Sequence, residues 1–116
     1  MPISIVVLSI VLAVAFTAAG LMKLVGHPAQ QQAADHFGIP WARYRAIGVL
    51  EIAGAAGVVV GFALTGLGAA AAIGLTLLMV SALTTHSRAG DPPAQMAPAA
   101  VLGGLSAVNA MLYLAH

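Results

Sequence analysis

Four apolar segments, each about twenty residues long, constrain the fold of this chain more than any other feature. They cover residues 3–23, 44–64, 67–86 and 96–115. Each is close to the ~20 residues that an α-helix needs to cross the hydrocarbon core of a bilayer. The segments lack the period-two alternation of membrane strands, and four strands could not close a barrel. We therefore expect an all-α integral membrane protein, a four-transmembrane-helix bundle that forms one domain over residues 1–116.

The composition excludes an ordinary soluble domain. Hydrophobic residues make up 61% of the 116 residues and charged residues only 6%, too few to cover a soluble surface. The chain has no cysteine, which excludes disulfides and thiolate metal sites within it. Its four histidines are scattered, and it has no phosphate-binding loop, nucleophile motif or basic patch. The sequence thus predicts no metal, no cofactor and no nucleic-acid partner.

The first connection, "VGHPAQQQAADHFGIPWAR", contains helix signals of its own. Pro28 suits a first helical turn and Gly38 a C-terminal cap, which predicts a short interfacial helix over residues 28–37. Three apolar residues are expected to anchor this helix at the membrane surface: Phe37, Ile39 and Trp41. The second connection is only "TGLG", and the third, "SRAGDPP", is typical of a loop.

The charged residues gather at one end of the expected bundle. All the basic residues flank the first and third connections: Lys23, Arg43, Arg45 and Arg88. The positive-inside rule then predicts that these connections are cytoplasmic and that both termini lie outside the cytoplasm. The acids, Asp35, Glu51 and Asp91, fall on the same side or just within the membrane from it.

Glu51 is the one charged residue deep in an apolar segment, inside the run "IGVLEIAGAAG". An ionised carboxylate is costly in hydrocarbon, so Glu51 should face the interior of the bundle. Three glycines share roughly its face and would let another helix approach closely: Gly54, Gly57 and Gly61. Glu51 is then either a functional group or a structural acid that pairs with Lys23 or Arg45.

An antiparallel bundle would bring Lys23, Glu51 and His86 together in its cytoplasmic half. Met79 lies in line with His86 on the third segment. The candidate ligand-binding residues are Lys23, Glu51, Met79, His86, Arg88 and Asp91. In an enzyme, Glu51 and His86 would be the catalytic acid–base pair. The simpler alternatives are interfacial anchoring by the basic residues, a helix-end role for His86, packing by Met79, and a loop ion pair between Arg88 and Asp91.

Three stretches resemble the DoxX-like family of small four-helix bacterial membrane proteins, which are related to DoxX and DoxD. They are "GLMKL", "RYRAIGVLEIAGAAG" and "LMVSALTTHSRAGD". The resemblance covers nearly the whole chain in order and spacing. It implies a four-helix bundle in the bacterial inner membrane, with Lys23, Glu51, His86, Arg88 and Asp91 at its polar positions. It also implies a redox or quinone connection, because related proteins are described in a thiosulfate:quinone oxidoreductase and in thiol-stress systems.

Three functions remain open from the sequence. The first is a membrane module that binds a small hydrophobic or amphipathic ligand, quinone- or lipid-like, in a cavity of the bundle. The second is an accessory or anchoring subunit of a membrane complex. The third is a cofactor-free enzyme that performs isomerisation or epoxide opening on a hydrophobic substrate. Membrane lipid surrounds the protein in each case, and its small-residue faces favour a homodimer or a partner membrane protein.

Overall fold

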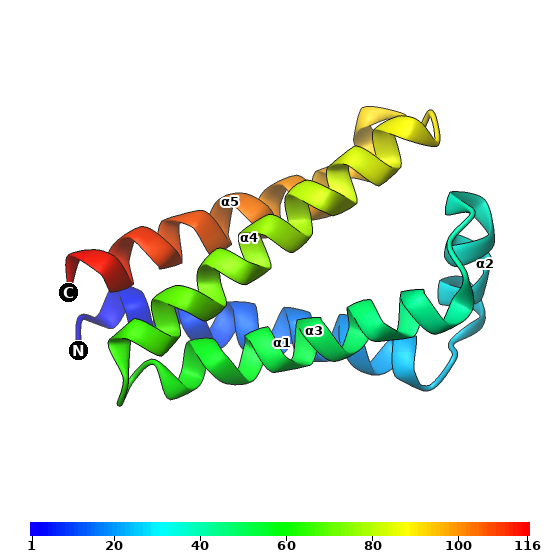
Figure 1. Cartoon of the computed structure of the whole chain (residues 1–116). Coiled ribbons are helices and arrows are strands. Elements are labelled where there is room, and N and C mark those ends of the chain that lie inside the picture. The colour runs from blue at the N-terminus through cyan, green and yellow to red at the C-terminus, as the bar shows by residue number, and fades with distance from the viewer.

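The computed structural model describes all of residues 1–116 and contains five α-helices and no strand, which confirms the all-α prediction. The helices are α1 (Ile3–Leu24), α2 (Pro28–Phe37), α3 (Trp41–Val60), α4 (Thr65–Arg88) and α5 (Pro93–Ala115). The four long helices lie along one another, with both chain termini at one end and the short α2 at the other (Figure 1).

Three of the long helices, α1, α4 and α5, are long and apolar enough to cross a membrane. The chain is therefore a membrane-embedded protein. The remaining long helix, α3, is not among the three. It carries Arg43, Arg45 and Glu51 within its 20 residues, and these charges lower its apolar character.

The helix ends differ from the predicted ones because prolines and turns set them. Helix α3 begins at Trp41 rather than at residue 44, directly after Pro40 at the N-cap, and it ends at Val60 rather than at residue 64. Helix α5 begins at Pro93 rather than at residue 96, since proline fits the first helical turn. Helix α4 extends past its predicted bounds at both ends. The short helix predicted over residues 28–37 has those bounds in the structure.

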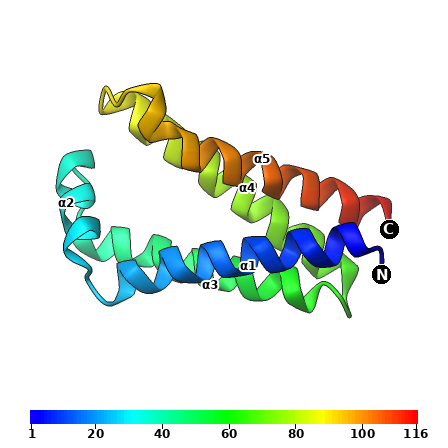
Figure 2. The same cartoon turned by 180° about the vertical axis from the view of Figure 1, so that it is seen from behind.

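The long helices form two pairs that separate toward α2. Helix α1 lies against α3, and α4 lies against α5; the pairs meet near the termini and diverge toward the other end (Figures 1 and 2). Glycines bring α1 and α3 into backbone contact. A Cβ atom on Gly20 would lie 2.6 Å from the carbonyl oxygen of Gly48, and one on Gly48 would lie 2.9 Å from that of Gly20.

Buried polar residues join the two pairs at the end near the termini. Ser9 Oγ donates a hydrogen bond to Asn109 Oδ1 at 3.3 Å and lies 3.3 Å from Tyr113 Oη. The Tyr113 hydroxyl donates in turn to the carbonyl oxygen of Val58. These bonds connect α1, α3 and α5, and buried networks of this kind hold helices in one arrangement.

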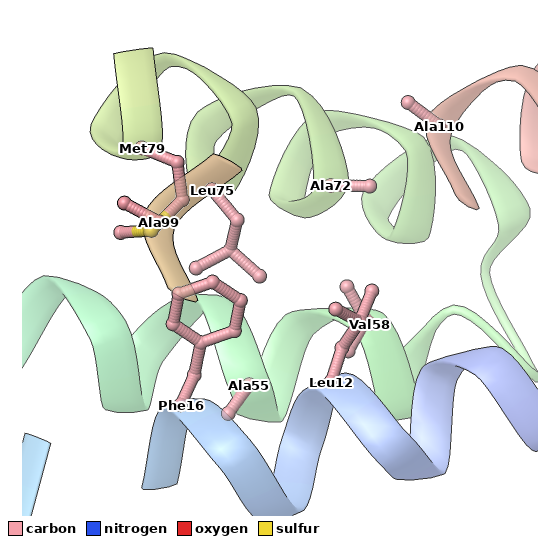
Figure 3. Close-up of a cluster of buried hydrophobic side chains, with 9 residues drawn as sticks. All are labelled: Leu12, Phe16, Ala55, Val58, Ala72, Leu75, Met79, Ala99 and Ala110. Atoms are coloured by element: carbon pink, nitrogen blue, oxygen red, sulfur yellow. The ribbon is translucent and has the colours of Figure 1, made fainter. Parts of the chain in front are cut away.

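The hydrophobic core fills the space between the two pairs, next to these polar residues. Figure 3 shows its nine residues, contributed by all four long helices: Leu12, Phe16, Ala55, Val58, Ala72, Leu75, Met79, Ala99 and Ala110. Phe16 points from α1 toward Met79 and Ala99 on the opposite pair (Figure 3). Met79 and Ala99 also line the cavity described next, so the core ends where that cavity begins.

Candidate functional site

A cavity of about 350 Å³ lies where the two helix pairs separate, and all five helices contribute to its lining. Its volume is within the usual range for small-molecule sites. Apolar residues make up just over half of the lining, 9 of 17. Its polar and charged side chains are Lys23, Gln30, Tyr44, Glu51, Ser81, Thr85, His86 and Gln95. We call this cavity the polar pocket.

An ion pair between Lys23 and Glu51 forms one wall of the polar pocket. Lys23 Nζ lies 2.8 Å from Glu51 Oε1, and the two side chains are only 11% and 4% exposed. The close approach of α1 and α3 makes this contact possible, because a Cβ atom on Gly48 would lie 2.9 Å from the Cβ of Lys23. Of the two partners considered for Glu51, the structure selects Lys23, while Arg45 is exposed.

Tyr44 also lines the polar pocket, although it was not among the residues expected at the site. Its ring centroid lies 5.3 Å from Lys23 Nζ, a cation–π contact, and its hydroxyl donates to Gln30 Oε1 of α2 at 3.2 Å. Trp41 stacks on the same ring at 5.9 Å. The spacing of Tyr44 in the sequence could have identified this residue, because it lies two helical turns before Glu51 and therefore on the same helix face.

Asp91 holds α2 beside the pocket through two histidines. Asp91 Oδ1 lies 2.6 Å from His36 Nε2 of α2, and Oδ2 lies 2.6 Å from His86 Nδ1 of α4. Phe37 packs edge-on against His86, with ring centroids 4.9 Å apart. We call His36, Asp91 and His86 the histidine–aspartate clasp. The interpretation of Arg88 and Asp91 as a loop ion pair is wrong, because Asp91 pairs with these histidines instead.

The structure brings together four of the six candidate ligand-binding residues: Lys23, Glu51, Met79 and His86 all line the polar pocket. Asp91 does not line it and reaches it only through His86. Arg88, the last residue of α4, is exposed and outside the pocket. Arg88 is only two residues from His86 in the sequence, but its side chain is exposed at the end of α4 and does not reach the pocket.

Two of the residues expected to anchor α2 at the membrane surface lie in the polar pocket instead. Phe37 and Ile39 line the polar pocket, where Phe37 also contacts His86. Their apolar character was recognised correctly, but the sequence does not show which way this short segment faces. In the structure Ala34 is the only fully buried residue of α2.

The clasp predicts a loss of stability in acid. The hydrogen bond from His36, with a second from His86, holds the pKa of Asp91 below its ordinary value of about 3.9. Between the folded and unfolded pKa values the unfolded chain binds more protons, so stability rises with pH there. This contribution is complete above the unfolded pKa and is lost as the pH falls through the folded pKa. We expect the Tm in detergent micelles to fall more for the wild type than for Asp91→Asn between about pH 6 and about pH 3. An equal fall in Tm with pH for the two proteins would contradict the role of Asp91 in the histidine–aspartate clasp.

Long apolar helices around a buried ion pair and a small cavity define a small membrane-embedded helical protein. More specifically, the chain belongs to the DoxX-like family, whose model matches residues 7–108. That match runs from α1 into α5 and includes every residue that lines the polar pocket. No curated protein and no solved structure gives a significant match.

Proposed function

We propose that this protein binds a small hydrophobic or amphipathic ligand, quinone- or lipid-like, in the polar pocket. The observation that carries the proposal is a cavity of about 350 Å³ with a mainly apolar lining and a buried ion pair in one wall. An apolar cavity with a few convergent polar groups is the usual form of a small-molecule site. Lys23, Glu51, Met79 and His86 would contact the ligand, and Asp91 would orient His86.

The charge balance of the pocket favours a ligand with a neutral polar head. Lys23 and Glu51 already compensate each other at 2.8 Å, so a charged head would enter without a counter-charge. The Thr85 hydroxyl donates to the Ser81 carbonyl oxygen and can still accept from a ligand hydroxyl, while the Gln95 amide can donate to a ligand hydroxyl or carbonyl. A quinone or an uncharged lipid head has this chemistry.

We further propose that α3 is a fourth membrane span. Arg43 and Arg45 are exposed near its first turns, where their side chains can extend to the headgroups, and Glu51 is paired inside the bundle. The positive-inside rule then supports a cytoplasmic end formed by α2 and the α4–α5 loop, with α2 at the interface and both termini outside. The host membrane would be the bacterial inner membrane.

Two variants test ligand binding. Glu51→Gln removes the charged anchor, and Ala82→Leu fills the polar pocket while leaving the ion pair intact. We expect Glu51→Gln to lower the amount of co-purified small molecule per mole of protein about tenfold or more, because a hydrogen bond to a charged group contributes about 1.5–3 kcal/mol. Ala82→Leu should lower the same amount because its larger side chain occupies the space of the ligand. Mass spectrometry of solvent extracts measures the amount of bound small molecule per mole of protein.

Ala70→Leu is the matched control for Ala82→Leu, since Ala70 is exposed on the same helix and lines neither cavity. It should retain ligand at the wild-type level. Folded wild-type protein without any bound molecule would contradict the proposal and favour an accessory role in a membrane complex.

An acid–base enzyme is the second candidate, and the clasp is the observation that favours it. His86 Nδ1 donates to the Asp91 carboxylate, which leaves Nε2 of this pocket-lining imidazole as the basic nitrogen. A histidine oriented by a carboxylate is a common general base. Adding the extracted molecule back to the wild type separates the two functions, since an enzyme would convert it to a product and a binding module would return it unchanged.

A further inference from the structure

A second cavity lies along the outside of the α3–α4 contact. It has a volume of about 610 Å³, and its lining is apolar except for Ser81. Helix α3 contributes Leu50, Ala53, Gly54 and Gly57, and α4 contributes the rest. We call this cavity the α3–α4 groove.

The groove and the polar pocket are adjacent. Leu78 and Ser81 line both of them. On α4, one face passes from the groove to the pocket through Leu67, Ala71, Gly74, Leu78, Ser81 and Thr85, with the helical spacing of three and four residues. The part of this face in the groove, from Leu67 to Ser81, is roughly 21 Å long at 1.5 Å per residue.

The chemistry changes along this face from apolar to polar. The groove end has no ionisable group, whereas the pocket end holds the Lys23–Glu51 ion pair. Gly74 leaves the middle of the groove open, because a Cβ atom there would meet no atom within 4 Å. The polar pocket and the long apolar groove therefore lie next to each other along α4.

We infer that the α3–α4 groove holds the apolar tail of the ligand whose polar head lies in the polar pocket. This inference rests on the proposed function and specifies it further: the ligand is a single-tailed amphiphile with a neutral, hydrogen-bonding head. Leu78 and Ser81 line both cavities, and this adjacency supports the tail of a pocket-bound ligand rather than a helix from another chain. The groove volume is also that of a small-molecule site.

Photoreactive hexadecanol tests the inference in phosphatidylcholine nanodiscs. One probe carries a diazirine next to the hydroxyl and the other carries it near the methyl end; labelled peptides are mapped by mass spectrometry. The first probe should label the polar pocket and the second the α3–α4 groove. Excess unlabelled hexadecanol should suppress both labels. Gly74→Leu fills the groove and should abolish groove labelling. Gly104→Leu should retain it, because Gly104 is an exposed glycine of α5 with equally open space and lines neither cavity.

The outcomes separate this inference from the proposed function. In one outcome the first probe labels the pocket while the second labels the protein diffusely and Gly74→Leu changes nothing. That result overturns the inference but leaves the proposed function standing. Absence of competable pocket labelling in the folded wild type contradicts the proposed function. Competable labelling of the groove without labelling of the pocket would indicate an independent lipid chain and overturn the inference.

A second copy of the chain in the groove is tested by Gly74→Cys, which supplies the only thiol of the protein. If the groove holds a ligand tail, this variant should stay monomeric under mild oxidation. Efficient formation of a disulfide-linked dimer in nanodiscs would overturn the inference.

Discussion

Replacing Lys23 by methionine is expected to destabilise the protein by about 3–5 kcal/mol, because it leaves a buried carboxylate without a counter-charge. Glu51 is 3% exposed, and its Oε1 atom makes no polar contact other than the one with Lys23 Nζ at 2.8 Å. The free energy of unfolding in mixed bicelles measures the loss. Arg43→Met is the control, since Arg43 is an exposed residue of α3 without an ion pair, and its effect should stay within about 0.5 kcal/mol.

The double variant Lys23→Met with Glu51→Leu should recover most of that loss. Removing both charges leaves neither partner uncompensated, and apolar replacements of buried ion pairs are often neutral or stabilising. The double variant should therefore fold nearly as well as the wild type but lack the charged wall of the polar pocket. Two results would show that Lys23 and Glu51 are not a buried pair. One is a loss of unfolding free energy for Lys23→Met as small as that for Arg43→Met. The other is a double variant that is no more stable than Lys23→Met.

Replacing Gly20 by alanine is expected to cost about 1–3 kcal/mol, as overpacking does in a dense core. The added Cβ would lie 2.6 Å from the Gly48 carbonyl oxygen and 2.6 Å from Ile52 Cγ1, so the α1 backbone must move away from α3. The Lys23–Glu51 contact depends on that approach, and we expect ligand occupancy to fall as well.

Gly104→Ala is the matched control for this prediction. A Cβ at Gly104 meets nothing within 4 Å, and alanine is the better helix former, so the control should be stabilised by about 0.5–1 kcal/mol. Unfolding in mixed bicelles compares the two variants. Effects of the same sign would contradict the close contact between α1 and α3.

The sequence predicted the polar side of the site because its charges are few and confined to one end of the helices. Glu51 had to face the interior, and Lys23 and His86 end helices on the same side, so their convergence followed from topology alone. The glycines near Glu51 were also interpreted correctly. A Cβ on Gly54 would clash with the side chain of Leu75 and one on Gly57 would lie 2.5 Å from Ala71, so α4 does close over this face.

The sequence could not predict how α2 is oriented. Its rotation depends on tertiary contacts such as the His36–Asp91 bond, which joins residues 55 positions apart. For the same reason Phe37 was expected in the membrane surface rather than against His86. The separation of the two helix pairs was also beyond the sequence, because the contacts that join the pairs near the termini connect distant residues, as the hydrogen bond from Tyr113 to Val58 does.

Mass spectrometry of solvent extracts from the wild type and from the Lys23→Met, Glu51→Leu double variant tests whether the Lys23–Glu51 wall of the polar pocket binds a ligand. The double variant keeps the fold and removes the polar wall, so folding and ligand binding are measured separately. We expect an amphiphile with a neutral head to be bound to the wild type and reduced about tenfold or more in the double variant. Equal amounts in the two folded proteins would contradict a ligand site at Lys23 and Glu51.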